Sequence, residues 1–145
     1  MKDKVFNIVI NPNGASGTAK TIFKKIEPLL IKNNIKYIVH TSSISEGISS
    51  ICSRLTKLNE DIYLVLIGGD GSLNEAVNGI VNFEKTYVGF IPCGSGNDFA
   101  RSINLPQKLD ELVSIIFKGE VKRTCDIGEV TMHNFSEEFR ILPDV

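Results

Sequence analysis

The sequence predicts one α/β domain with three layers, in which a mostly parallel sheet carries helices on both faces. Three observations indicate this class. Short apolar runs that are typical of buried strands alternate with stretches whose apolar residues recur at helical spacing. Glycine-rich loops follow the first, third and fourth apolar runs. The chain of 145 residues is long enough for one hydrophobic core but not for two full lobes.

The strands and helices can be assigned from these patterns. Buried strands are expected over residues 5–10, 35–40, 62–67 and 87–91, and a fifth extended stretch over residues 121–130. Helices are expected between them, with apolar faces over residues 22–30, 48–58, 73–81 and 109–117. Pro28 should kink or shorten the first helix. Ser43 and Glu46 have the spacing of a capping box ahead of the second helix.

Composition excludes several classes of function. The formal net charge is −1, so there is no basic field for a nucleic acid partner. The densest positive cluster, Lys20, Lys24 and Lys25, is expected to be the solvated face of a surface helix. The longest apolar runs have about six residues, whereas ~20 are needed to span a bilayer. We therefore expect a cytoplasmic protein whose contact with membranes, if any, is peripheral.

The cysteines and histidines do not form a recognisable site. Cys52, Cys93 and Cys125 are odd in number and include no CxxC pair, which argues against structural disulfides and against a zinc site. Cys52 falls on an apolar helix face, where a buried thiol is expected. His40 and His133 have no partner at ligand spacing, so neither is assigned a chemical role.

The most informative segment is Gly68-Gly69-Asp70-Gly71-Ser72, which joins the third strand directly to a helix. A loop with so few side chains exposes backbone N–H groups to an anion, and the helix N-terminus adds a partial positive charge. Asp70 would repel a bare phosphate, so we expect a metal ion or a reacting hydroxyl beside it. The segment indicates nucleotide phosphate chemistry.

The two common phosphate-binding motifs do not match. A Walker loop needs Gly-Lys after four intervening residues, but Gly14 is followed five positions later by Ala19. A dinucleotide fingerprint would need glycine where Phe99 stands. Taken alone, the loop over residues 11–17 is expected to be a simple strand-to-helix connection.

Several polar residues near the loops also have an explanation from folding alone. Ser72 and Glu75 have capping-box spacing, and Asn97 or Asp98 could cap the helix that follows them. Asp126 lies on an extended stretch and could face solvent. Asp70, between glycines at a strand end, has no such explanation from the sequence.

Taken together, these segments resemble the diacylglycerol kinase catalytic domain, most closely the soluble bacterial lipid kinases. The resemblance depends on the Gly68–Ser72 loop with Asn74-Glu75, on Pro92-Cys93-Gly94-Ser95-Gly96-Asn97-Asp98-Phe99-Ala100, on Asp126-Ile127-Gly128 and on the opening Asn11-Pro12. It runs from the first strand to about Val130. Ser72 and Ser95 stand where the family often has threonine. NAD kinases resemble the first loop but lack the second, and sphingosine kinases usually lack the acid matched by Asp98.

The resemblance implies ATP and Mg²⁺ as cofactors and a lipid acceptor such as diacylglycerol at a membrane surface. The γ-phosphate would pass to the lipid hydroxyl, giving a phosphatidic-acid-type product. By resemblance, Asp70, Asp98 and Asp126 are the catalytic acids, and Asp70 either holds magnesium or takes the acceptor proton. The residues implied to line the nucleotide are Asn11, Gly14, Gly17, Gly68, Gly69, Gly71, Ser72, Gly94, Ser95, Gly96 and Asn97, with Glu75 as a weaker candidate.

The resemblance also implies a domain organisation. Residues 1–130 match the nucleotide-binding lobe, and residues 131–145 would begin the connection to a second, β-rich domain, so the isolated chain is expected to be inactive. Two alternative functions stay open: a noncatalytic nucleotide-binding module and an NAD-kinase-like activity on a soluble acceptor. The oligomeric state also stays open, with a homodimer as one candidate. The acceptor lipid and the nucleotide preference are not predicted.

Overall fold

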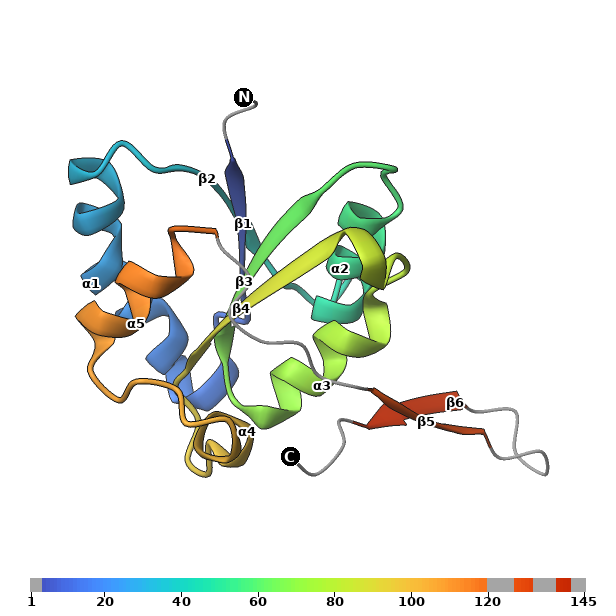
Figure 1. The fold of residues 1–145 in the computed structure, drawn as a ribbon. Coiled ribbons are helices and arrows are strands. Elements are labelled where there is room, and N and C mark those ends of the chain that lie inside the picture. The colour runs from blue at the N-terminus through green and yellow to red at the C-terminus, as the bar shows by residue number, and fades with distance from the viewer. Residues whose placement is uncertain (1–3, 120–126, 132–137, 142–145) are drawn as a thin grey trace.

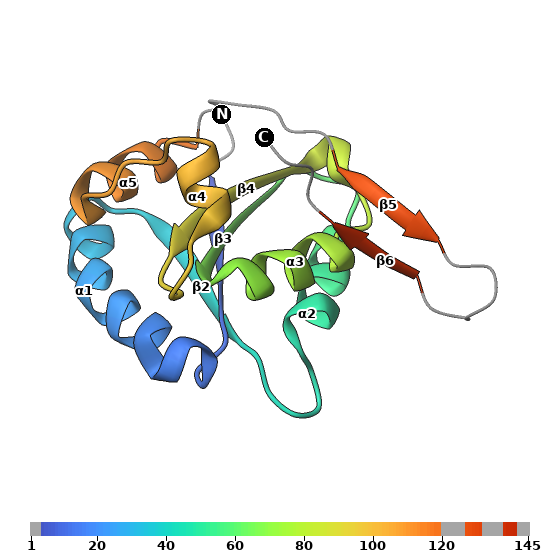
Figure 2. The same ribbon diagram turned by 90° about the horizontal axis from the view of Figure 1, so that it is seen from below.

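The computed structural model describes residues 4–119, 127–131 and 138–141. Four parallel strands form its sheet in the order β2-β1-β3-β4, with β1 Val5–Ile10, β2 Lys36–Thr41, β3 Ile62–Gly68 and β4 Thr86–Pro92. Helices lie on both faces of this sheet (Figure 1 and Figure 2). The predicted α/β class with a parallel sheet is confirmed, and the four strands lie within one residue of their expected ends.

The two central strands hold the core. β1 is buried from Phe6 to Ile10, and β3 is buried throughout except at Tyr63, as expected for strands that are covered on both faces. Alternate residues divide between the faces. Val9, Leu64 and Leu66 join one apolar cluster, and Ile8, Val65 and Ile67 join the other.

Two helices pack over each of these apolar clusters. α1 Thr18–Lys32 and α5 Leu109–Ile116 bury Ile26, Leu30 and Leu112 on one face of the sheet. α2 Ile48–Thr56 and α3 Asp70–Gly79 bury Ile51, Leu73 and similar residues on the other face. The short helices η1 Gly14–Gly17, η2 Phe83–Lys85 and α4 Asp98–Ser102 belong to the connections. Figure 2 shows the two pairs of long helices on opposite sides.

Three local predictions need correction. The first helix is not shortened at Pro28 but continues to Lys32. Ser43 Oγ does accept the Glu46 N–H at 3.1 Å, yet this closes a turn ahead of α2, whose N-cap is Gly47. Leu58 and Val81, expected on buried helix faces, are 51% and 57% exposed because their helices end before them.

The fifth extended stretch does not join the parallel sheet within the described residues. β5 Gly128–Thr131 pairs with β6 Glu138–Ile141 in a separate antiparallel sheet of two strands. The rest of the stretch, including Cys125 and Asp126, lies outside the described residues, as does His133. No helix among the residues described is long and apolar enough to cross a membrane.

Cys52 fits the expectation of a structural thiol. Its side chain is completely buried among the apolar residues of α2 and the sheet, and burial raises its pKa to about 12. A thiol with so high a pKa is protonated at neutral pH and therefore unreactive.

Contacts between α2 and α3 fix the position of α3, whose first turn is formed by Asp70, Gly71 and Ser72 of the Gly68–Ser72 segment. The buried Thr56 Oγ1 donates to the Cys52 carbonyl at 2.7 Å and accepts the Val81 N–H at 2.9 Å. Gly79 packs against the backbone of Ser49 so closely that a Cβ there would lie 2.1 Å from the Ser49 carbonyl oxygen. Only glycine fits this crossing of the two helices.

This contact predicts a large effect of a single methyl group. Gly79→Ala should lower the free energy of unfolding by about 1–3 kcal/mol or more, because overpacking forces the helices apart. Gly71→Ala on the same helix is the matched control, since nothing lies within 4 Å of a Cβ there and alanine favours a helix. Urea unfolding of both variants checks this prediction, and equal stability would contradict it.

Candidate functional site

Three glycine-bearing loops follow β1, β3 and β4 and lie at one edge of the sheet. Because the strands are parallel, their carboxyl ends meet at this edge, where ligands bind in open α/β sheets. Figure 1 shows the three loops below the sheet, with α4 beside the start of α3. The sequence-based prediction that these loops share one rim is confirmed by the strand order.

The loop after β1 is shaped by Asn11. Its side-chain oxygen accepts the Asn13 N–H at 3.0 Å, and its carbonyl accepts the Gly14 N–H at 3.0 Å. Gly14 lies tightly against the Asn11 side chain, with 3.2 Å between a Cβ at Gly14 and the Asn11 Cβ. Gly17 has φ +83°, a left-handed conformation that favours glycine, and it is the N-cap of α1. The Asn11 side chain therefore has a structural role here.

The loops after β3 and β4 touch through their glycines. The Cys93 N–H donates to the Gly68 carbonyl at 2.9 Å, which extends the strand pairing by one step. Beyond it, a Cβ on Gly94 would lie 2.8 Å from the Gly69 Cα, and a Cβ on Gly69 would lie 3.3 Å from the Gly94 Cα. The two backbones pack face to face, so Gly94 leaves no room for a side chain and a side chain at Gly69 would be tightly packed.

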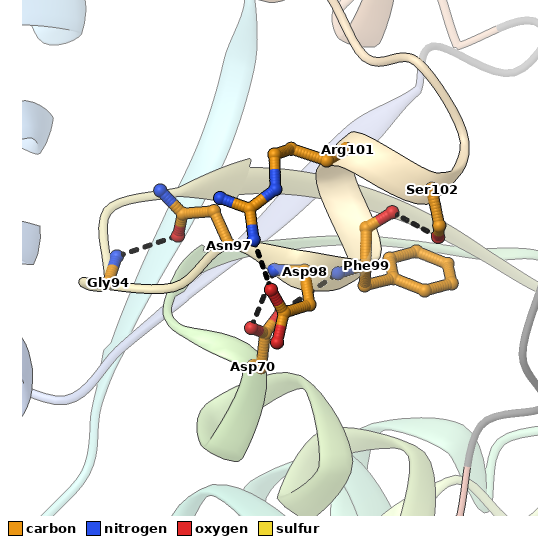
Figure 3. A network of polar contacts seen from close by, with 7 residues as sticks. All are labelled: Asp70, Gly94, Asn97, Asp98, Phe99, Arg101 and Ser102. Atoms are coloured by element: carbon orange, nitrogen blue, oxygen red, sulfur yellow. Dashed lines mark hydrogen bonds and ion pairs between the residues drawn. The ribbon is translucent and has the colours of Figure 1, made fainter.

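Asp70 connects the two loops. One of its carboxylate oxygens accepts the Asp98 N–H at 2.8 Å, and the other accepts the Phe99 N–H at 3.2 Å (Figure 3). These are the first N–H groups of α4, so Asp70 acts as the N-cap side chain of a helix 28 residues away. The sequence alone offers no explanation of Asp70 from folding, and the structure provides one.

Asn97 has a different role from the one predicted from its position. It stands at the N-cap of α4 with φ +54°, but its side chain makes no capping hydrogen bond. Instead, its Oδ1 accepts the Gly94 N–H at 3.0 Å and closes the turn over residues 94–97. The Gly94 N–H therefore has a hydrogen-bond partner within the protein. Ser95 and Gly96 are the exposed residues of this turn.

Asp98 lies beside Asp70. A Cβ on Gly96 would be 3.6 Å from an Asp70 carboxylate oxygen and 3.8 Å from both oxygens of Asp98. Arg101 pairs with the Asp98 carboxylate one helical turn on (Figure 3). Arg101 was not among the predicted site residues, although its spacing of three residues from Asp98 on a helix would have suggested this pair.

The N-terminus of α3 is open. Gly69 is its N-cap, and no side chain of the described residues makes a capping hydrogen bond there, so the Ser72–Glu75 capping box does not form. Ser72 instead packs against Gly68, where a Cβ would be 2.7 Å from the Ser72 Cβ. Gly71 has nothing within 4 Å of a Cβ, and Glu75 is exposed one turn further along. Free N–H groups at a helix start suit an anion.

A metal site made of protein ligands alone is not present in the part of the chain that the structure describes, where no group of three His, Cys, Asp or Glu side chains converges. Magnesium needs fewer, because it is usually held by one or two carboxylates together with substrate phosphates. The carboxylates of Asp70 and Asp98, which both lie near Gly96, fit that requirement. The third predicted acid, Asp126, lies outside the described residues.

Comparison with known proteins decides the family. The family model of the diacylglycerol kinase catalytic domain matches residues 6–130. The chain belongs to this family. The resemblance stated from the sequence motifs is confirmed, and the match includes all three glycine loops described above.

Members of the diacylglycerol kinase family with curated names or solved structures resemble the chain along most of its length. It is 33% identical over 132 residues to a diacylglycerol kinase of Staphylococcus carnosus, covering 88% of this chain and 42% of that protein. For a diacylglycerol kinase of Staphylococcus aureus strain Newman, the identity is 32%, with 88% and 40% covered. A crystal structure of a diacylglycerol kinase from Bacillus anthracis superposes with a TM-score of 0.66 at 27% identity, covering 88% and 46%. The chain spans about two-fifths of the length of these curated relatives.

The capping contact of Asp70 makes a prediction about stability. Asp70→Ala removes the acceptor of two N–H groups of α4, so it should lower the free energy of unfolding by about 1–2 kcal/mol. Amide hydrogen exchange at Asp98 and Phe99 should accelerate. Glu60→Ala, a change at an exposed acid, serves as the control. Unchanged exchange at both amides would contradict the capping role.

Proposed function

We propose that this chain forms the nucleotide-binding part of a lipid kinase that transfers the γ-phosphate of ATP to the hydroxyl of diacylglycerol or a similar lipid, giving a phosphatidic-acid-type product. The family supports the reaction class. The names of the relatives, diacylglycerol kinase, support the acceptor. The acceptor side is proposed to lie in the part of the relatives that this chain does not match.

One observation carries the proposal: the open N-terminus of α3 lies directly beside the paired carboxylates of Asp70 and Asp98. Uncapped N–H groups attract phosphate oxygens, whereas carboxylates repel them. The two are compatible if a divalent cation lies between the carboxylates and the phosphates. This combination of groups is the one that phosphoryl transfer needs, because that reaction depends on positioning and on neutralising charge.

We propose different roles for the residues of the three loops. The backbone of Gly71 and Ser72 at the α3 N-terminus would hold the phosphates, joined from the opposite loop by Ser95 and Gly96. Asn11, Gly14 and Gly17 would shape the adjoining loop, and Gly68, Gly69, Gly94 and Asn97 would hold the two central loops together. Glu75, one turn along α3, is the weakest of these candidates.

Asp70 and Asp98 would hold Mg²⁺, which when bound neutralises charge on the phosphate oxygens. Each oxygen of Asp70 accepts one N–H and keeps a further lone pair for the cation or for a water. Asp70 therefore has two open roles, as a magnesium ligand and as the acceptor of the lipid hydroxyl proton. Asp126 is proposed to complete this acidic group.

A nucleotide titration tests the binding site. The chain should bind Mg·ATP with a dissociation constant in the high micromolar to millimolar range, roughly 4–6 kcal/mol of binding free energy. Gly71→Ala should weaken binding by tenfold or more, because a methyl group on the proposed phosphate-binding backbone would hinder close approach. The fold should stay intact, since nothing lies within 4 Å of a Cβ at this position. Cys93→Ala is the control in the neighbouring loop, where the thiol packs toward the core. Wild-type affinity in Gly71→Ala would contradict the proposed phosphate site.

A transfer assay tests the reaction. With labelled ATP and dioleoylglycerol in detergent micelles, this chain alone should transfer no phosphate. A chimera that joins residues 1–130 to the unmatched remainder of the Staphylococcus carnosus kinase should do so. A folded chimera that binds ATP but phosphorylates NAD instead of the lipid would contradict the proposed acceptor.

The role of Asp70 toward magnesium can be separated from its role as a helix cap. If it holds the cation, wild type should bind ATP more tightly with Mg²⁺ than with EDTA, and Asp70→Asn should bring that ratio close to one. If it only caps α4, both affinities should fall by the same factor. Calorimetry under the two conditions measures the ratio, and Asp98→Asn should reduce it as well.

A further inference from the structure

The three glycine loops contain no basic side chain. Residues 11–17, 68–72 and 93–100 include no lysine or arginine. Backbone N–H groups carry partial charges, whereas phosphate oxygens carry full ones, so sites for phosphoryl transfer usually add a lysine or an arginine. The basic residues within three positions of a loop are Lys20 and Arg101. Of these two, Arg101 contacts an acid of the proposed site.

The Arg101 side chain is directed toward the two acids of the site. One nitrogen of its guanidinium group donates to an Asp98 carboxylate oxygen, and Figure 3 shows the side chain extending back along α4 toward Asp98 and Asp70. This direction is the usual one, because side chains tilt toward the N-terminus of their helix. Both carboxylates lie near Gly96. The guanidinium group is therefore beside the acids that we propose to hold the cation.

The pair of Arg101 with Asp98 can be exchanged at little cost. The two side chains are 66% and 79% exposed, and pairs in such positions contribute little to stability. Within the described residues this is the only polar contact of the Arg101 side chain, and it uses one nitrogen. Arg54, in contrast, binds Glu46 through two nitrogens at 3.0 Å each. Arg101 can thus change its partner while the backbone of α4 stays in place.

A divalent cation would compete with Arg101 for the Asp98 carboxylate. Two positive groups beside one carboxylate repel each other, and the divalent ion has the higher charge. Phosphate oxygens bound at the start of α3 would then be the alternative acceptors for the guanidinium group. Arginine suits this role, because its planar fork of N–H groups can bind two oxygens of one phosphate.

We propose that Arg101 exchanges partners when the nucleotide binds. It pairs with Asp98 in the absence of a divalent cation, and it binds a phosphate of the nucleotide once a cation is held by that carboxylate. The inference rests on the proposed function in that Mg·ATP is taken as the ligand. It follows that Arg101 weakens the binding of a cation alone and strengthens the binding of the cation together with the nucleotide.

Two binding measurements on Arg101→Gln test the exchange without any assay of activity. Mn²⁺ replaces Mg²⁺ in an NMR titration without nucleotide, where paramagnetic broadening of the Gly96 and Asp98 amide signals reports the bound ion. Arg101→Gln should bind Mn²⁺ roughly fivefold more tightly than wild type, the factor expected for an exposed ion pair. By calorimetry it should bind Mg·ATP about tenfold less tightly, because a charged hydrogen bond to phosphate is lost. A change in the stability of α4 would shift both affinities in the same direction.

Two further variants serve as controls. Arg54→Gln removes the same charge from the exposed pair with Glu46 and should change neither affinity. Arg101→Lys keeps the charge but not the planar fork, so its Mn²⁺ affinity should stay within about twofold of wild type while its Mg·ATP affinity falls roughly threefold.

The proposal is overturned if Arg101→Gln leaves the Mn²⁺ affinity unchanged, if it shifts both affinities in the same direction, or if neither it nor wild type binds Mn²⁺. Wild type that binds Mg·ATP while Arg101→Gln behaves like Arg54→Gln would overturn this inference alone. Wild type that binds no Mg·ATP would overturn the proposed function and this inference with it, so the two failures are distinguishable.

Discussion

The structure of the site depends on the close packing of Gly69 against Gly94, reinforced by the Asp70 carboxylate. Two strand ends bring the loops to the same edge, but parallel pairing alone would leave each loop free beyond its strand. The glycine contact and the two N–H bonds to Asp70 fix the second loop and the start of α4 on the first. The N-terminus of α3, the turn over residues 94–97 and the Asp98 carboxylate thereby acquire fixed relative positions.

Several polar side chains of the site make hydrogen bonds within the protein in the absence of any ligand. Asn11 closes one loop on itself, Asn97 closes another, and Asp70 caps α4. Side chains that match the binding motifs of the diacylglycerol kinase family thus also stabilise the local structure of this chain. Preorganisation of this kind is favourable for phosphoryl transfer, because a loop that is already held in place loses little entropy when a phosphate binds.

The sequence predicted the strands well because each is a short apolar run, and it predicted the shared rim because parallel strands must end at one edge. It could not predict the cap of α4, since that bond joins residues 28 apart and only the folded sheet brings them together. Ser43 with Glu46 and Ser72 with Glu75 show the converse error. The local spacing of a capping box was present in both pairs, but the helices begin at neighbouring glycines. Pro28 is tolerated in α1 because it lies on the exposed side of the helix. Proline has no N–H, so the carbonyl four residues earlier lacks its usual donor, but water can hydrate it there.

The charge at the site also differs from what the sequence suggests. In the sequence, Asp70 between glycines looks like an isolated carboxylate that only a metal ion or a reacting hydroxyl could explain. In the structure, two N–H groups at a helix start already stabilise its charge, and Arg101 pairs with Asp98. Asp70 alone is therefore accounted for by folding. The second carboxylate, Asp98, has only weak support from folding, since an acid in the first turn of α4 and an exposed pair with Arg101 each contribute little to stability. The case for a cation thus depends on both acids meeting beside Gly96, near the N-terminus of α3, which no side chain in the described part of the chain caps.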